Sequence, residues 1–198
     1  MPTPIPLFSA RFFFVRHGES VANAARLFAG QLDVALTEQG KRDAEEAARW
    51  LVDETIGTLY ASPLQRVWQT AAPIAAAKGN LEIHPVEGII ERTYGEWEGK
   101  PTGDYDRGAK PPGGESPEEF NARTIAALQA LRGTPPILIV AHAGTFRALR
   151  GHLCGIDTTY DTLANGRPVA FTPPASGDGP WTVELVGAPG EELFLPPT

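Results

Sequence analysis

Residues 11–19 read Arg-Phe-Phe-Phe-Val-Arg-His-Gly-Glu, and this stretch decides both the expected fold and the candidate site. The consecutive apolar residues Phe12–Val15, bounded by a glycine turn, predict a short buried strand. The strand delivers a cation, Arg16, and an imidazole, His17, side by side into the turn. That layout suits an anion-binding site with a histidine nucleophile.

A second strand end further along the chain has a similar layout. The apolar run Ile137–Val140 is followed by Ala-His-Ala-Gly at residues 141–144, which places His142 in a turn. In parallel α/β sheets the ligand crevice lies beyond the carboxyl ends of the strands. We therefore predict that His17 and His142 converge on one site.

Strand and helix patterns alternate between and around these two runs. Apolar runs predict strands at residues 11–17, 56–61, 81–86, 136–142, 169–171 and 181–186, the third of them near a sheet edge. Helical periodicity and start signals predict helices over 37–54, from Ser62 onward, over 116–131 and over 144–153. This order predicts an α/β fold, a three-layer α/β/α sandwich with a mostly parallel central sheet of about six strands and an antiparallel strand near the C-terminus.

Two of the expected helices share one start signal. Ser62 and Ser116 are each followed by proline and, three residues after the serine, by Gln65 or Glu119. The serine is expected to cap the helix, the proline to occupy its first position, and the third residue to complete a capping box. The helix after Ser62 is expected to bury a stripe made of Leu64, Val67, Trp68, Ala71 and Ile74.

Length and composition limit the protein classes that remain. The 198 residues suit one domain over 1–198, with loosely held ends at 1–6 and 196–198 and a Gly- and Pro-rich flap at 99–114. The net charge of −7 and the lack of a basic stripe argue against a nucleic-acid partner. With one cysteine, Cys154, no metal-ligand spacing, no signal-peptide pattern and no membrane-length apolar run, we expect a cytoplasmic protein without a cofactor or membrane partner.

The chemistry of a phosphate monoester fits the charged residues near the two strand ends. Its dianion must be held and neutralised, and its leaving oxygen must be protonated. Arg16 and Arg66 suit the first two tasks, neutral His17 can act as the nucleophile, and His142 can act as a charged or hydrogen-bonding clamp. Glu91, just after the third strand, is the expected acid, since a partly desolvated carboxyl can stay protonated.

Several motifs in order resemble those of the histidine phosphatase superfamily, the phosphoglycerate mutase-like proteins. The motifs are Arg16-His17-Gly18-Glu19-Ser20 with Asn23, Gly30-Gln31 with Asp33, Leu36-Thr37 with Gly40, Ser62-Pro63-Leu64-Gln65-Arg66 with Gln69-Thr70-Ala71, Glu91 with Gly95-Glu96-Trp97-Glu98-Gly99, Pro112-Gly113-Gly114-Glu115-Ser116, and His142-Ala143-Gly144. The resemblance implies that His17 accepts the phosphoryl group and that Glu91 donates the proton. It also implies a phosphate pocket of Arg16, Arg66 and His142, further hydrogen bonds from Asn23, Ala143 and Gly144, and no metal.

The resemblance leaves three functions to weigh. The leading one is a metal-independent phosphatase acting on a small phosphorylated metabolite, with the flap residues Lys100, Asp104, Tyr105, Arg107 and Lys110 on the leaving-group side. A mutase needs extra cations and a closing lid, but no Lys or Arg follows Arg167 and the insert from Glu91 to Glu115 is short. A non-catalytic domain that binds phosphorylated ligands is the third, and the intact nucleophile and acid argue against it. Oligomeric state is not predicted.

Overall fold

The central element of the computed structural model, which describes residues 3–156 and 163–187, is a mixed sheet. Its strand order is β4-β3-β6-β2-β7-β8. The strands are β2 (Phe12–Arg16), β3 (Thr58–Ala61), β4 (Ile83–Pro85), β6 (Ile137–Ala141), β7 (Pro168–Thr172) and β8 (Thr182–Leu185). The first four strands in that order are parallel, β7 is antiparallel to β2, and β8 is antiparallel to β7. The predicted sheet is confirmed, including the edge position of β4.

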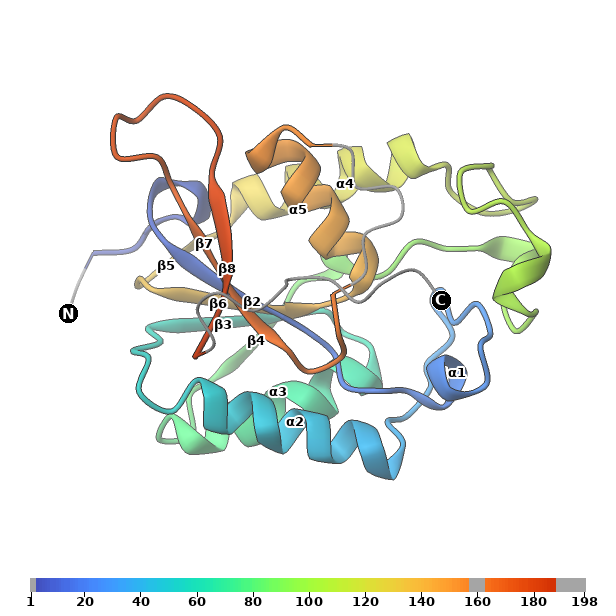
Figure 1. The fold of residues 1–198 in the computed structure, drawn as a ribbon, viewed down its shortest axis with the longest axis horizontal. Helices are drawn as coiled ribbons and strands as arrows, with labels where there is room; N and C mark the ends of the chain where they lie inside the picture. Colours follow the sequence, from blue (N-terminus) through green and yellow to red (C-terminus); the bar gives the residue numbers. More distant parts are fainter. Residues whose placement is uncertain (1–2, 157–162, 188–198) are drawn as a thin grey trace.

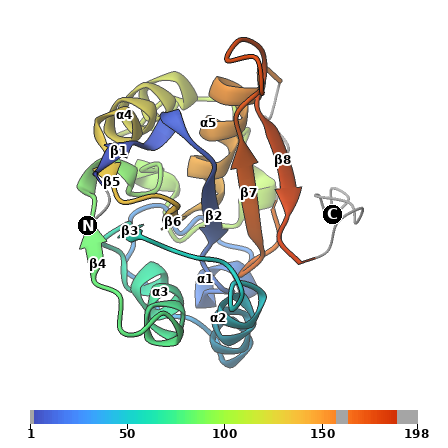
Figure 2. The same cartoon turned by 90° about the vertical axis from the view of Figure 1, so that its left-hand side faces the viewer.

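Helices cover both faces of this sheet (Figures 1 and 2). The helices α2 (Glu38–Trp50) and α3 (Gln65–Ala77) lie on one face, and α4 (Pro117–Ala130) and α5 (Ala143–Cys154) lie on the other. Along β2, Phe13 and Val15 pack into the core with α2 and α3, while Phe12 and Phe14 pack into the core with α5. Burial of both faces explains why the strand is continuously apolar.

Several short elements carry too little periodicity to be predicted. They are β1 (Ile5–Pro6), which pairs antiparallel with β5 (Arg132–Gly133), the one-turn helix α1 (Val21–Ala24), and the 3-10 turns η1 (Leu7–Ser9), η2 (Glu87–Ile89), η3 (Gly95–Trp97) and η4 (Thr102–Asp104). Thus Ile5–Pro6, inside the end expected to be loosely held, is hydrogen-bonded to the chain. The other expected loose end, 196–198, lies outside the described residues.

The two predicted serine caps have different outcomes. Ser116 caps α4 with a complete capping box to Glu119, as predicted. The prediction for Ser62 is wrong, because α3 begins at Gln65 without a side-chain cap from its own N-cap residue. Ser62 is still extended, since its N–H donates to the carbonyl of Val140, and the Asp33 carboxylate accepts from the Gln65 N–H at 2.6 Å instead.

Two smaller expectations about helices also need correction. The helix predicted over 37–54 ends at Trp50, after which residues 51–53 form a turn. Trp68 was expected in the buried stripe of α3, but it is 37% exposed, because it lies outside the buried face of the helix, which is made of Arg66, Val67, Thr70, Ala71, Ile74 and Ala75.

The flap at 99–114 is attached to the segment that follows α1. The N–H of Phe28 donates to the Lys100 carbonyl, and the N–H of Gly99 donates back to the Phe28 carbonyl. The buried Phe28 ring contacts the rings of Tyr94, at 4.5 Å between centroids, and of Tyr105, at 6.0 Å. The flap is therefore a packed loop with an aromatic base.

Candidate active site

His17 lies at the carboxyl end of β2 and is 4% exposed. Its main-chain N–H donates to the Ala141 carbonyl at 2.9 Å, which continues the β2–β6 ladder by one residue. Its Nδ1 lies 2.8 Å from the Gly18 carbonyl oxygen, an atom that can only accept. Nδ1 therefore carries the proton, and Nε2 of the neutral ring keeps its lone pair.

His142 occupies the equivalent place at the end of β6 and is the N-cap residue of α5. It is fully buried, and its ring centroid lies 5.3 Å from that of His17. Its Nε2 is 2.7 Å from the hydroxyl of Ser62, and its Nδ1 has a long contact of 3.5 Å with Nη2 of Arg66. The predicted convergence of the two histidines is thus confirmed.

The two arginines of the predicted pocket are both buried beside these rings. Arg66, 1% exposed, donates to the carbonyls of Gly30 and Leu32, each at 2.8 Å. Arg16 donates to the Leu163 carbonyl at 2.6 Å. Each guanidinium keeps one buried Nε–H without a protein acceptor among the described residues. Unsatisfied buried donors are rare, and two on neighbouring cations suit an anion-binding site.

Burial and positive charge together set the protonation states of the pocket. Burial, and then the charges of Arg66 and Arg16, hold the pKa of His17 well below its usual range. Burial, and then Arg66, do the same to the pKa of His142. Both rings are therefore neutral at pH 7, so His142 is suited to hydrogen bonding rather than to acting as a charged clamp. Burial, and then Arg147, lower the pKa of Arg16 to about 10, which leaves it charged.

Glu91 joins the pocket from the irregular segment between η2 and η3. One carboxylate oxygen accepts from the Gly144 N–H at 3.3 Å, in the first turn of α5, and the other accepts from the Arg92 N–H at 2.9 Å. Its charge acts on both Arg16 and Arg66, whose pKa values it raises against the lowering effect of burial. Arg16, His17, Arg66, Glu91 and His142 are thus brought together.

The three predicted main-chain and amide contributors are placed less directly. Gly144 lends its N–H to Glu91, and Ala143 is the first residue of α5. Asn23 completes the capping box of α1 with Ser20, and within the described residues it makes no hydrogen bond to either histidine. It connects to His17 through Asn165, whose amide donates to the His17 carbonyl at 2.8 Å and to Asn23 at 3.4 Å.

Some supporting residues were missed by sequence reasoning. Thr70 accepts from the Gly18 N–H at 3.0 Å and donates to the Arg66 carbonyl. It therefore connects the turn after His17 to α3. Asn165 and the Leu163 carbonyl come from the loop before β7. The Asn165-Gly166 pair signals a turn, but nothing in its sequence says that the turn lies against β2. Glu19, which follows the glycine turn, accepts from the Thr37 hydroxyl at 2.7 Å.

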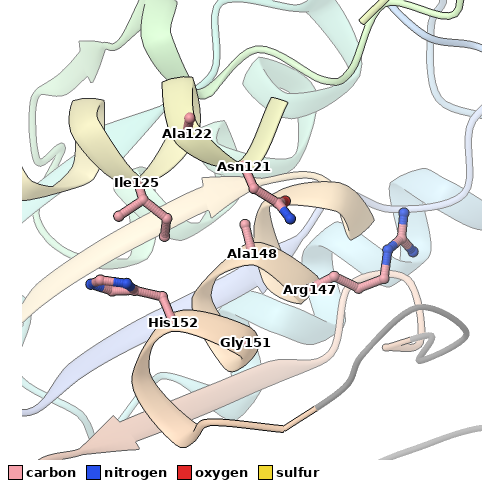
Figure 3. Close-up of a pocket in the computed structure, with 7 residues that line it drawn as sticks. All are labelled: Asn121, Ala122, Ile125, Arg147, Ala148, Gly151 and His152. Carbon is pink, nitrogen blue, oxygen red and sulfur yellow. The ribbon is translucent and has the colours of Figure 1, made fainter. Parts of the chain in front are cut away.

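A separate groove of about 350 Å³ lies between α4 and α5 (Figure 3). It is lined by Asn121, Ala122, Ile125, Arg147, Ala148, Gly151 and His152. None of the five predicted catalytic residues is in this lining. Arg147 lies at the end opposite His152, and its charge lowers the pKa of Arg16. The charge at that end of the groove therefore acts on Arg16.

Residues 3–156 and 163–187 hold no group of three or more His, Cys, Asp or Glu side chains that could bind a metal ion. In the same part of the chain, none of the helices is both long enough and apolar enough to cross a membrane.

Comparison with known proteins identifies the family. The family model described as the histidine phosphatase superfamily (branch 1) matches residues 12–186. The chain belongs to the histidine phosphatase superfamily. Phosphoserine phosphatase 1 of Hydrogenobacter thermophilus is 34% identical to this histidine phosphatase superfamily member in an alignment of length 164 that covers 74% of this chain and 77% of that protein.

Other relatives of this superfamily member carry different activities in their names. The 2,3-bisphosphoglycerate-dependent phosphoglycerate mutase of Cytophaga hutchinsonii is 34% identical in an alignment of length 177 that covers 78% of this chain and 83% of that protein. Among solved structures, the α-ribazole phosphatase of Shigella flexneri matches with a TM-score of 0.75 at 23% identity, covering 92% of this chain and 99% of that one. That structural match shows the shared fold.

Proposed function

We propose that this protein is a metal-independent phosphatase that hydrolyses a small phosphomonoester through a phosphohistidine at His17. The observation that carries the proposal is the bond from His17 Nδ1–H to the Gly18 carbonyl. It leaves Nε2 of a neutral, buried imidazole with a lone pair that can attack phosphorus, and the charges of Arg66 and Arg16 act on this ring. Arg16 and Arg66 supply the positive charge that the phosphate dianion requires.

The proposed reaction has two steps. In the first, Nε2 of His17 forms a bond to phosphorus while the bond from phosphorus to the leaving oxygen breaks, and Glu91, which must be protonated in the enzyme–substrate complex, gives its proton to that oxygen. In the second, the Glu91 carboxylate takes a proton from water as the water oxygen attacks phosphorus. The N–P bond breaks, inorganic phosphate leaves, and His17 and protonated Glu91 are restored.

Phosphoglycerate mutase activity is the second candidate, supported by the 34% identity to the Cytophaga mutase. A mutase must hold a doubly phosphorylated intermediate, which calls for additional cations beside the pocket. In the flap region, Lys110 is paired with Glu119 at 2.6 Å and Arg92 donates to three main-chain carbonyls. No Lys or Arg follows Arg167 in the sequence. Lys110 and Arg92 are thus engaged elsewhere, and the preference for hydrolysis rests on the tail after Arg167, which adds no cation to Arg107 and Arg147.

The proposed substrate is a small phosphorylated metabolite whose leaving group faces the flap and the start of α5. The charges of Arg107 in the flap and of Arg147 in α5 both lower the pKa of Arg16, which supports a leaving group on that side. We propose the cytoplasm as the site of action, in keeping with the one free cysteine, Cys154, of the chain.

The test is a set of assays on one preparation of the full chain. p-Nitrophenyl phosphate, 3-phosphoglycerate and O-phosphoserine are each incubated with it, and phosphate release is measured alongside interconversion of 3- and 2-phosphoglycerate. We expect phosphate release to exceed interconversion. Faster interconversion would establish the mutase instead, and no turnover of any substrate would leave a phospho-ligand binding domain.

A further inference from the structure

The segment that carries Glu91 is not part of any helix or strand, so its position depends on side chains. The side-chain amide of Gln31 donates to the main-chain carbonyl of Glu91 at 3.1 Å. The residue after Glu91 makes the most extensive contacts of the segment. Arg92 is 5% exposed, and its guanidinium packs over the Tyr94 ring at 5.0 Å.

The Arg92 guanidinium donates to three main-chain carbonyls from two other parts of the chain. Nε donates to Glu115 at 2.8 Å, Nη1 to Arg107 at 2.7 Å, and Nη2 to Ala109 at 2.6 Å. A buried guanidinium is costly unless its donors are satisfied, and these bonds are charge-assisted. Arg92 therefore fixes the flap and the segment at residue 115 against the residue next to Glu91.

Glu115 extends this network to the other side of Glu91. Its carboxylate accepts from the Thr93 N–H at 3.1 Å and pairs with Arg123 of α4 at 2.7 Å. Arg123 in turn donates to the carbonyls of Gly88, at 3.0 Å, and Ile90, at 3.1 Å. The main chain is thus held before and after Glu91, and the Glu91 carboxylate accepts the hydrogen bond from the Gly144 N–H.

We propose that Arg92 is a positioning residue that holds the Glu91 carboxyl in place for proton transfer to the leaving oxygen. Arg92 acts through the main chain, because its N–H donates to Glu91 Oε1 while its side chain points to the flap carbonyls. This inference rests on the proposed function, since it assigns Glu91 the role of acid. It makes the position of the acid depend on the flap that faces the leaving group.

Leaving-group basicity separates this role from a purely structural one. p-Nitrophenolate is weakly basic and leaves without protonation, whereas the alkoxides of 3-phosphoglycerate, O-phosphoserine and glycerol 3-phosphate need an acid. The variants are Arg92→Met, which keeps length without donors, and Arg92→Lys, which keeps charge with fewer donors. Arg132→Met is the matched control, because Arg132 also donates to carbonyls, of Gln129 and Leu131, but is exposed.

We expect kcat on the alkyl phosphates to fall by about 10- to 100-fold in Arg92→Met, a part of the roughly 10²- to 10⁴-fold that an acid contributes. Turnover of p-nitrophenyl phosphate should change by less than about threefold. Adding Arg92→Met to Glu91→Gln should cause no further loss on alkyl phosphates, because the acid is already absent. Arg132→Met should leave both substrate types unchanged.

Equal losses on both substrate types, or full additivity with Glu91→Gln, would overturn the proposal. If Arg92→Met does not fold, the ratio of kcat on alkyl phosphates to kcat on p-nitrophenyl phosphate is measured on Arg92→Lys and decides the proposal. Failure of both variants to fold would assign Arg92 to stability alone. The p-nitrophenyl phosphate activity of the wild type separates the two proposals, since its absence would count against the phosphatase function rather than against the role of Arg92.

Discussion

The two sides of the candidate site are built in different ways. On the nucleophile side, His17 and His142 follow adjacent parallel strands, and the ladder between β2 and β6 continues to the His17 N–H. On the acid side, Glu91 lies in an irregular segment whose anchors are the side chains of Arg92 and Arg123. Main-chain hydrogen bonding of the sheet positions the proposed nucleophile, and side-chain contacts to carbonyls position the proposed acid.

This difference predicts how each side responds to change. A strand end is supported by many neighbouring residues. A substitution there should therefore reduce catalytic activity without unfolding the protein. The acid side depends on a few long side chains, so substitutions there should alter protonation of the leaving group selectively. The following experiments are ordered by expected effect.

The largest effect is expected from His17→Ala. Loss of the nucleophile should reduce kcat by about 10⁴-fold or more on every substrate, including p-nitrophenyl phosphate. The cooperative thermal transition measured by circular dichroism should remain, because β2 keeps its ladder. His84→Ala is the control, since that side chain is exposed, with a relative exposure of 42%. An active His17→Ala enzyme would break the assignment of the nucleophile side.

Glu91→Gln should have a smaller and selective effect. We expect kcat on alkyl phosphates to drop by roughly 10²- to 10³-fold, while p-nitrophenyl phosphate loses much less, because only the alkyl leaving groups need the proton. Steady-state kinetics on both substrate types measures the ratio. Uniform losses would mean that Glu91 holds the pocket together rather than acting as its acid.

The pH dependence of the free energy of unfolding tests whether His17 and His142 are neutral in the folded protein. Burial, ahead of nearby arginine charge, lowers the pKa of His17 and of His142 in the fold. In the unfolded chain both bind a proton below about pH 6.5, so acidification stabilises the unfolded state. The free energy of unfolding should therefore be level near pH 7.5 and fall below about pH 6.5, by up to about 1.4 kcal/mol per pH unit for each histidine.

Urea denaturation between pH 7.5 and pH 5 measures this slope. His142→Gln should reduce the slope, because one of the two buried titrating groups is gone. His84→Gln is the matched histidine substitution outside the site, at a side chain that is 42% exposed. A wild-type stability that does not change over this range would contradict the neutral state of both rings.

The smallest effects come from a pair of serines that share a sequence signal. Ser116→Ala should cost about 1 kcal/mol of stability through loss of the α4 cap, with kcat unchanged. Ser62→Ala leaves the buried His142 without its 2.7 Å partner, and kcat should fall by about tenfold, the equivalent of one hydrogen bond. Denaturation and kinetics on both variants check the contrast, and an unchanged kcat in Ser62→Ala would show that His142 is held by other contacts.

The sheet and the nucleophile side were predictable because their signals are local. Apolar runs such as Phe12–Val15 identify buried strands, and the fold rule for parallel sheets brings their carboxyl ends together. The Ser62 prediction failed because Asp33, distant in sequence, caps α3 at Gln65 and leaves the serine free to bind His142. Local signals cannot register such a long-range partner.

The acid side could be predicted only in part. Family motifs identified Glu91, but the carbonyl partners of Arg92 have no sequence signature, because every residue carries a carbonyl. The same holds for Asn165, whose turn signal does not reveal the strand against which the turn packs. Side chains that bind distant main-chain atoms become visible only in three dimensions.

The most direct test of the central claim is to trap the phosphorylated enzyme. The protein is mixed with p-nitrophenyl phosphate, quenched in alkali within milliseconds to preserve phosphohistidine, digested and mapped by mass spectrometry. We predict one acid-labile phosphoryl group on the peptide containing His17, at Nε2, and its absence from His17→Ala. Phosphate release by the wild type with no label on His17, or with the label on His142, would contradict the account.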